Sequence, residues 1–182
     1  IPVRIGLLDP QGKEVIGPKL DYDCSARTHL DADSTLLIHS TEPVTTLKVL
    51  GLSMRPTVSF LRGFSAPVRI ESSVSALDLE FLVAKDSDPF VRWDAAQRLV
   101  VSEIDQMQKG LPNDGATVRL FGAFLAQARQ GIKSRDAGPS LALLAALAVL
   151  PEENYIFDQL AEFDVDAVCM ARADLRGRIG KE

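Results

Sequence analysis

The chain has 182 residues, of which 46% are hydrophobic and 25% charged, ordinary values for a globular protein of one domain or two small ones. Its formal net charge of −5 argues against a broad cationic surface, so we expect neither a nucleic acid nor a membrane as a partner. The longest apolar run, residues 141–150, is about half of the ~20 residues that cross a bilayer, so we expect no membrane-spanning helix.

The cysteines and the first residues bear on the cellular setting. Cys24 and Cys169 lie far apart, and a chain of this size needs no disulfide to fold, so we expect a reducing, cytoplasmic location. Residues 1–3 hold no initiator methionine and begin no targeting segment. We therefore expect this chain to be a piece of a longer protein.

The sequence offers few residues for metal or nucleophilic chemistry. His29 and His39 are ten residues apart, and neither begins an HExxH, the spacing that places two imidazoles on one zinc ion. The two cysteines have no neighbouring imidazole or second thiol. Glycine-rich phosphate loops and the GxSxG nucleophile turn are also absent from the sequence. We predict no catalytic, cofactor-binding or metal-binding residue in this chain.

Residues 1–72 have the pattern of short β-strands. A strand at 3–8 leads into the turn Asp9-Pro10-Gln11-Gly12, and residues 13–16 are expected to return as the second arm of a hairpin. Further apolar runs predict strands at 36–38, 47–50, 57–61 and 67–70, with Pro67 starting the last. Short strands with this turn punctuation predict a small antiparallel β-sandwich of the immunoglobulin-like kind.

From residue 73 onward the apolar period becomes helical. Ser75 and Asp78 form a Ser-x-x-Asp helix start, followed by an apolar row at residues 77, 81 and 84, and Asp88 with Pro89 opens a second helix. A third helix is expected around 118–132, with a break at 136–139. The apolar run at 141–150 predicts a short helix buried on every side, and Asp164 caps the last of six helices.

Six helices joined by short breaks are typical of an α-solenoid of the ARM or HEAT kind. The expected domains are a β-sandwich at 1–72 and a helical, solenoid-like domain at 73–182. Residues 1–72 hold eight basic and eight acidic side chains, so the net charge of −5 lies entirely on the helical part. We interpret this charge as that of solvated helix faces.

Two stretches resemble a known family: LRGFSAPV at residues 61–68 and DSDPFVRWDAAQRL at residues 86–99. Both are similar to the middle region of bacterial aminopeptidase N, the alanyl aminopeptidase of the gluzincin metallopeptidases, as is the opening IPVRIGLLD. The resemblance implies the β-sandwich third domain and the first helices of the α-helical fourth domain. The family's zinc ligands and the acidic loop that grips a substrate amino terminus belong to the preceding domain, so no site residue carries over.

This resemblance implies a non-catalytic scaffold within a zinc aminopeptidase that removes N-terminal residues from peptides. The helices would wall the chamber around the zinc, and the catalytic domain of the same polypeptide and peptide substrates would be the partners. An alternative is a stand-alone adaptor that binds a protein on the solenoid, and a third is a self-contained hydrolase without a recognised motif. We also expect self-association through an uncovered apolar face of the last helix.

Overall fold

The structure is a computed structural model that describes residues 1–17, 20–72, 74–134 and 141–181. It divides into two compact units, Ile1–Arg92 and Trp93–Glu182. The chain break expected at residues 136–139 lies outside the described residues.

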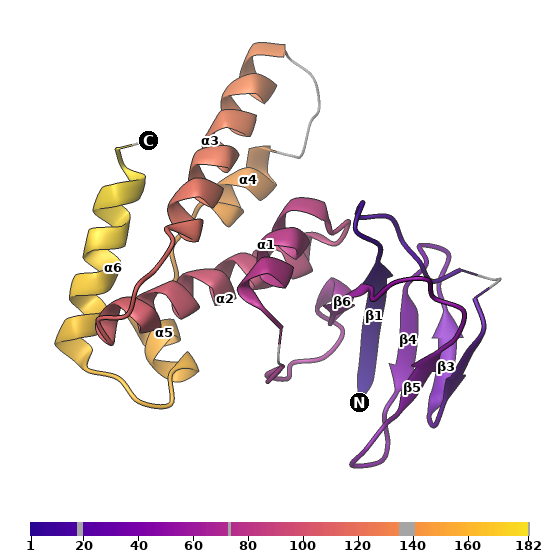
Figure 1. Cartoon of the computed structure of the whole chain (residues 1–182). Helices are drawn as coiled ribbons and strands as arrows, with labels where there is room; N and C mark the ends of the chain where they lie inside the picture. The colour runs from indigo at the N-terminus through magenta and orange to yellow at the C-terminus, as the bar shows by residue number, and fades with distance from the viewer. Residues whose placement is uncertain (18–19, 73, 135–140, 182) are drawn as a thin grey trace. The chain divides into compact units, whose positions relative to one another are not determined.

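The first unit is built on two antiparallel sheets (Figure 1). The larger sheet has the order β3-β4-β1-β6, and its strands are β1 (Pro2–Leu8), β3 (Arg27–Leu30), β4 (Leu36–His39) and β6 (Thr57–Phe60). The smaller sheet pairs β2 (Tyr22–Cys24) with β5 (Leu47–Val49). The predicted antiparallel sandwich is confirmed.

Strand β1 lies in the interior of the larger sheet and sets its register. Its first half pairs with β4, from Pro2↔His39 to Ile5↔Leu36, and its second half pairs with β6, from Ile5↔Phe60 to Leu8↔Thr57. Side chains alternate between the two faces of a strand, so one face of β1 reaches the space between the sheets. The sandwich core there consists of Ile5, Leu7, Ile16, Leu36 and Ile38.

Three sequence expectations for this unit need correction. Residues 13–16 form no strand: the Val15 N–H donates to the Leu7 carbonyl over 2.8 Å, and Leu8 and Glu14 make an isolated bridge, because β4 already occupies the rest of that edge of β1. Residues 67–70 are irregular, so Pro67 begins no strand. The strands β2 and β3 were missed because polar and charged residues interrupt their alternation.

Helix α1 (Ala76–Lys85) begins as predicted. Ser75 and Asp78 form a complete capping box, in which each side chain accepts from the other residue's backbone N–H. The buried face is not the predicted row, however: Leu79, Leu82 and Val83 are buried, whereas Leu77 is 76% exposed. The apolar residues of this helix cover more than one face, and the face that packs is not the row at 77, 81 and 84.

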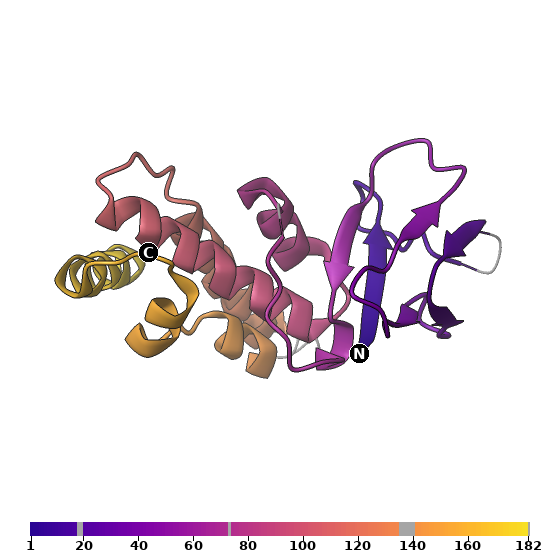
Figure 2. The ribbon, with the colours of Figure 1, turned by 90° about the horizontal axis from the view of Figure 1, so that it is seen from below.

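Helix α2 (Pro89–Gln108) begins in the first unit and runs into the second, which adds α3 (Ala116–Ser134), α4 (Leu141–Leu147), α5 (Glu153–Gln159) and α6 (Val165–Ile179) (Figure 1, Figure 2). No strand occurs among the described residues after 88, and helix α3 contacts both α4 and α6. The core of the second unit is formed by Val100, Val101, Ile104, Phe121, Ile156, Val168, Ala171 and Leu175. The predicted series of helices is confirmed.

The apolar run at 141–150 differs from its prediction. Helix α4 buries Leu144 and Leu147, but Leu141 is 50% exposed and Val149, just beyond the helix, is 60% exposed. The helix therefore packs on one face within the described residues and is not enclosed on all sides. Uniform apolar composition predicts burial, but which faces are covered depends on neighbours that composition does not specify.

Candidate functional site

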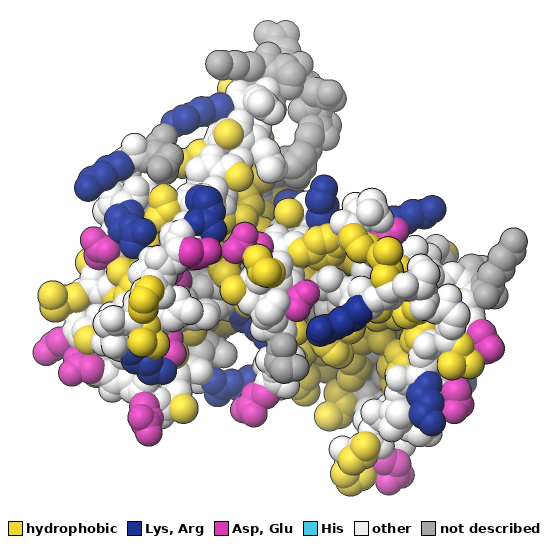
Figure 3. All heavy atoms as spheres, in the orientation of Figure 1, with side chains coloured by type: hydrophobic (Ala, Val, Ile, Leu, Met, Phe, Trp, Pro, Cys, Tyr) yellow, Lys and Arg dark blue, Asp and Glu magenta, His cyan; other side chains and the backbone are white. Residues whose placement is uncertain are grey.

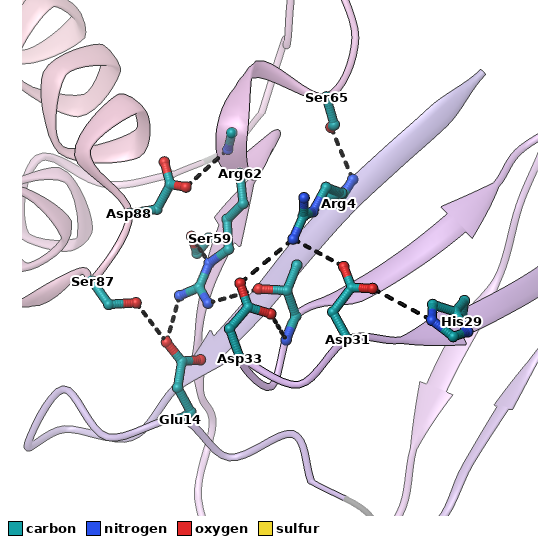
Figure 4. Close-up of polar contacts among 12 residues, drawn as sticks. Arg4, Glu14, His29, Asp31, Asp33, Ser59, Arg62, Ser65, Ser87 and Asp88 are labelled. Atoms are coloured by element: carbon teal, nitrogen blue, oxygen red, sulfur yellow. Dashed lines mark hydrogen bonds and ion pairs between the residues drawn. The ribbon is translucent and has the colours of Figure 1, made fainter.

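A buried charged cluster surrounds Arg62 in the first unit (Figure 4). Arg62 is only 3% exposed, although arginine is rarely buried unless it is paired. The described residues that meet it come from four places along the chain: the turn after β1, the segment before β4, strand β6 and the connection between α1 and α2.

The local sequence places the Arg62 side chain across β1. Strand β6 ends at Phe60, and the short 3₁₀ turn Arg62–Phe64 follows with left-handed backbone angles at Leu61 (φ 57°) and Gly63 (φ 62°). At Gly63 this conformation has no steric cost, because glycine adopts positive φ freely. On β1, a Cβ at Gly6 would lie 2.1 Å from Arg62 Cζ, so the guanidinium occupies space that only a glycine leaves open.

The guanidinium uses all three nitrogens. Nε donates to Ser59 Oγ over 2.8 Å, and Nη1 donates to Thr35 Oγ1 over 3.3 Å. Nη2 forms ion pairs with Glu14 Oε1 at 2.7 Å and with Asp86 Oδ1 at 3.1 Å. The Asp86 side chain is fully buried, so the two charges are removed from water together. Such a pair is stable only while each charge has its partner.

The three residues between α1 and α2 all bind this region. Asp86 pairs with Arg62, and Ser87 Oγ donates to Glu14 Oε1 over 3.1 Å. Asp88 Oδ2 accepts from the Gly63 N–H over 2.8 Å, while its Oδ1 accepts from the Val91 N–H over 2.9 Å and so caps α2. The connection is thereby fixed to the sandwich by side chains and backbone alike.

Two further contacts lie in the same region. The rings of Phe64 and Phe90 lie 5.1 Å apart between centroids, a distance at which aromatic pairs attract. Arg92 Nε donates to the Val83 carbonyl over 2.8 Å and ties the first turn of α2 to α1. Burial lowers the pKa of Arg92, and the negative charge of Asp86 partly opposes that shift. We call the residues Glu14, Ser59, Arg62, Gly63, Phe64, Asp86, Ser87, Asp88 and Phe90 the Arg62 joint.

The residues that could serve metal chemistry lie outside the joint, and the two histidines lie on neighbouring strands, where His39 pairs with Arg27 and His29 with Leu37. The His29 side chain is 70% exposed and lies 3.5 Å from Asp31, which also pairs with Arg4 at 2.9 Å (Figure 4). His39 is exposed at the end of β4. Both cysteines are free thiols, with Cys24 half-buried and Cys169 exposed. Among the residues that the structure describes, no group of three or more His, Cys, Asp or Glu side chains is arranged to hold a metal ion.

The second unit contains buried polar groups that the sequence did not reveal. Glu103 of α2 is 5% exposed, and its Oε2 accepts from the Thr117 N–H over 2.9 Å in the first turn of α3. A carboxylate at this position satisfies a free helix N–H and the positive end of the helix dipole. Gln97 Nε2 donates to the Val149 carbonyl over 3.1 Å. The Glu103 side chain thus links α2 to α3, and the Gln97 side chain links α2 to the segment after α4.

The architecture is that of an immunoglobulin-like domain followed by ARM-type helical repeats. Residues 1–73 match the family model described as a domain of unknown function (DUF3458) with an Ig-like fold, and residues 76–182 match the model described as a domain of unknown function (DUF3458_C) with ARM repeats. The chain belongs to the DUF3458_C family. The predicted domain boundary at 72/73 stays a prediction. The division into compact units falls elsewhere, between residues 92 and 93.

Relatives named Aminopeptidase N match along the chain. The protein from Caulobacter vibrioides is 33% identical over 124 residues, which are 68% of this chain and 14% of that protein. The Escherichia coli protein is 27% identical over 186 residues, and the Haemophilus influenzae protein 24% over 182; both alignments cover 100% of this chain and 19% of the relative. The chain thus spans less than a fifth of the length of these relatives, and the resemblance inferred from the two motifs is confirmed.

A solved structure shows the same fold. The crystal structure of Legionella pneumophila aminopeptidase A in complex with aspartic acid aligns with a TM-score of 0.71 and 24% identity, over 100% of this chain and 18% of that one. No helix among the described residues is long and apolar enough to cross a membrane. Homology thus indicates that this chain corresponds to part of an aminopeptidase.

The two motifs that carry the resemblance meet in the Arg62 joint. The run at 61–68 supplies Arg62, Gly63 and Phe64, and the run at 86–99 supplies the connection and the first residues of α2. Their side chains therefore bind each other. Both motifs therefore have a structural role. They are separated in the sequence but contact each other in the fold.

Proposed function

We propose that this chain is a non-catalytic structural part of a zinc-dependent aminopeptidase that removes N-terminal amino acids from peptides. The observation that carries the proposal is the Arg62 joint: the two motifs that resemble aminopeptidase N bind to one another in a buried cluster. The zinc ion, its ligands and the group that recognises the substrate amino terminus would be supplied by another part of the same polypeptide.

The chemistry of the joint supports a positioning role. Glu14 and Asp86 are held by the Arg62 guanidinium, and Asp88 is held by two backbone N–H groups, so these carboxylates accept hydrogen bonds and neutralise a cation. A general base or a metal ligand needs a lone pair directed at a substrate or an ion. The bonded oxygens are directed at the protein's own donors. Glu14 Oε2 and Asp86 Oδ2 have no hydrogen-bond partner among the described residues, but both are buried away from solvent, which favours structure over catalysis.

The helical part is proposed to wall the chamber around the zinc site. Stacked helical repeats present extended surfaces, and here α2 begins in the joint and continues into the core of the second unit. The partners on this proposal are the catalytic domain of the same polypeptide and the peptides that enter the chamber. The free thiols of Cys24 and Cys169 support the further proposal of a cytoplasmic location, where thiols stay reduced.

The test compares the 182-residue chain with the complete product of its gene, using alanine p-nitroanilide as substrate. We expect activity that is lost on chelation and restored by zinc from the complete product, and neither activity nor bound zinc from the chain alone. Arg62→Ala in the complete enzyme should lower its stability while the kcat/KM of the folded fraction stays within about twofold. One tightly held zinc in the 182-residue chain, or a complete product without chelator-sensitive activity, would refute the proposal.

A further inference from the structure

The sandwich contains an apolar hollow of about 470 Å³ between its two sheets. Its floor is the inner face of the larger sheet, through Ile5 and Leu7 of β1 and Val58 and Phe60 of β6, and its side is formed by Leu47 and Val49 of β5. In the space-filling view, apolar side chains gather over these strands, where the surface is hollowed (Figure 3).

The hollow exists because the two sheets differ in width. Four strands form one sheet and two form the other, so the smaller sheet leaves part of the inner face over β1 and β6 uncovered. Ile5 and Leu7 are 4% exposed, whereas Val58 and Phe60 on β6 are only half-buried. The segments before and after β5 also contain the apolar residues Val44, Leu50 and Met54, each more than half exposed. An open apolar surface of this kind marks a place where another element packs.

The backbone of β5 beside the hollow has an unpaired edge. The Ser25 N–H donates to the Thr46 carbonyl and the Leu50 N–H to the Asp21 carbonyl, so the even-numbered residues of this segment direct their backbone groups at β2. Backbone groups alternate sides along a strand, and those of Leu47 and Val49 therefore point away from β2. Within the described ranges these groups have no hydrogen-bond partner, and such an edge is a template for another strand.

We infer that an extended strand from outside residues 1–182 of the same polypeptide pairs with the free edge of β5 and fills the hollow with alternate apolar side chains. The inference rests on the proposed function, which supplies the longer polypeptide. The matching relatives are long enough, because this chain spans 19% of the Escherichia coli protein. Main-chain hydrogen bonds to Leu47 and Val49 would hold the strand, and the apolar lining would select its inward side chains.

The size of the edge favours the same polypeptide over a second copy of the chain. Strand β5 has three residues, so a partner in trans would gain few hydrogen bonds, whereas stable interfaces bury about 1,200–2,000 Å². A segment of the same polypeptide is held nearby by the chain itself, at a high effective concentration, and needs no large interface. The occupant is therefore expected to be covalently linked.

Amide hydrogen exchange tests the inference. In the 182-residue chain the Leu47 and Val49 amides should exchange as exposed groups do. In the complete gene product their exchange should be slower by about 100-fold or more. Lys48, whose backbone faces β2, is the internal reference and should be protected in both. Equal exchange at Leu47 and Val49 in the two proteins would overturn the inference, as would protection in the short chain that grows with its concentration.

A pair of variants separates backbone pairing from side-chain loss. Leu47→Ala and Leu47→Pro both remove the leucine side chain, but only the proline variant removes the N–H on the free edge. The proline variant should lower the unfolding midpoint of the complete product more than the alanine variant does, with no such difference in the 182-residue chain. If the complete product is an active zinc peptidase and its β5 edge exchanges freely, this inference is refuted and the proposed function stands. If the β5 edge is protected but the product has no such activity, the inference stands and the proposed function is refuted.

Discussion

Replacing Arg62 by alanine should destabilise the first unit more than almost any surface substitution. The change leaves the fully buried Asp86 carboxylate without the guanidinium that lies 3.1 Å away, and it leaves Glu14 without its partner at 2.7 Å. Removing one member of a buried ion pair costs about 3–5 kcal/mol. Glu14 is 21% exposed and recovers part of its hydration, so most of the loss comes from Asp86.

Urea unfolding, followed by circular dichroism and by the fluorescence of Trp93, the first residue after the first unit, measures this loss. With a denaturant slope of about 2 kcal/mol/M, the midpoint should fall by roughly 1.5–2.5 M. The matched control is Arg4→Ala, which removes ion pairs to Asp31 and Asp33 from a side chain that is 35% exposed. Exposed pairs contribute about 0–1 kcal/mol because water screens them. Equal midpoints for the two variants would refute the view that the joint depends on a buried charge.

Three further predictions follow from other features. Gly6→Ala should lower the urea midpoint because its Cβ would lie 2.1 Å from Arg62 Cζ, whereas Gly17→Ala, with nothing within 4 Å, should leave it almost unchanged. An NMR titration should find the pKa of Asp94 above the ordinary aspartate value, because burial outweighs the nearby Arg98, and that of Asp114 below it, because Arg119 and a backbone N–H bind its carboxylate. Asp94 thus stabilises the fold less as pH rises from the ordinary value through its raised pKa, and Asp94→Asn should flatten that slope. Amide exchange should be faster in α6, where Val165 and Met170 are more than half exposed, than in α2, unless the chain self-associates; uniformly slow exchange in a strict monomer by light scattering would contradict this.

Local signals in the sequence predicted the elements whose chemistry is local. The capping box of Ser75 and Asp78, the Asp88 cap before Pro89 and the Asp164 cap before α6 are all present, because each needs only residues within one helical turn. The turn at Asp9–Gly12 also forms, with the Gly12 N–H donating to the Asp9 carbonyl over 2.9 Å. Such features are visible in a single sequence.

The joint was not predictable as a cluster, although both motifs that build it were recognised. Arg62 and Asp86 are 24 residues apart, and neither periodicity nor spacing indicates that their charges meet in the interior. Gly6 carries no local signal either, since its role is to leave room for a side chain that is distant in sequence. Tertiary packing also decides which apolar surface of a helix is covered. For this reason the sequence predicted the wrong buried face for α1 and full burial for α4, which has an exposed face.

The connection between α1 and α2 bears on where the gene for this protein can recombine. The two family models meet between residues 73 and 76, yet Glu14 and Arg62 find Asp86 and Ser87 on the far side of that seam. A gene rearrangement that exchanged one domain at the seam would separate a cation from its buried counter-ion. We therefore expect the sandwich, α1 and the first turn of α2 to have evolved as one recombination unit, with tolerated crossovers lying later in α2, beyond the joint.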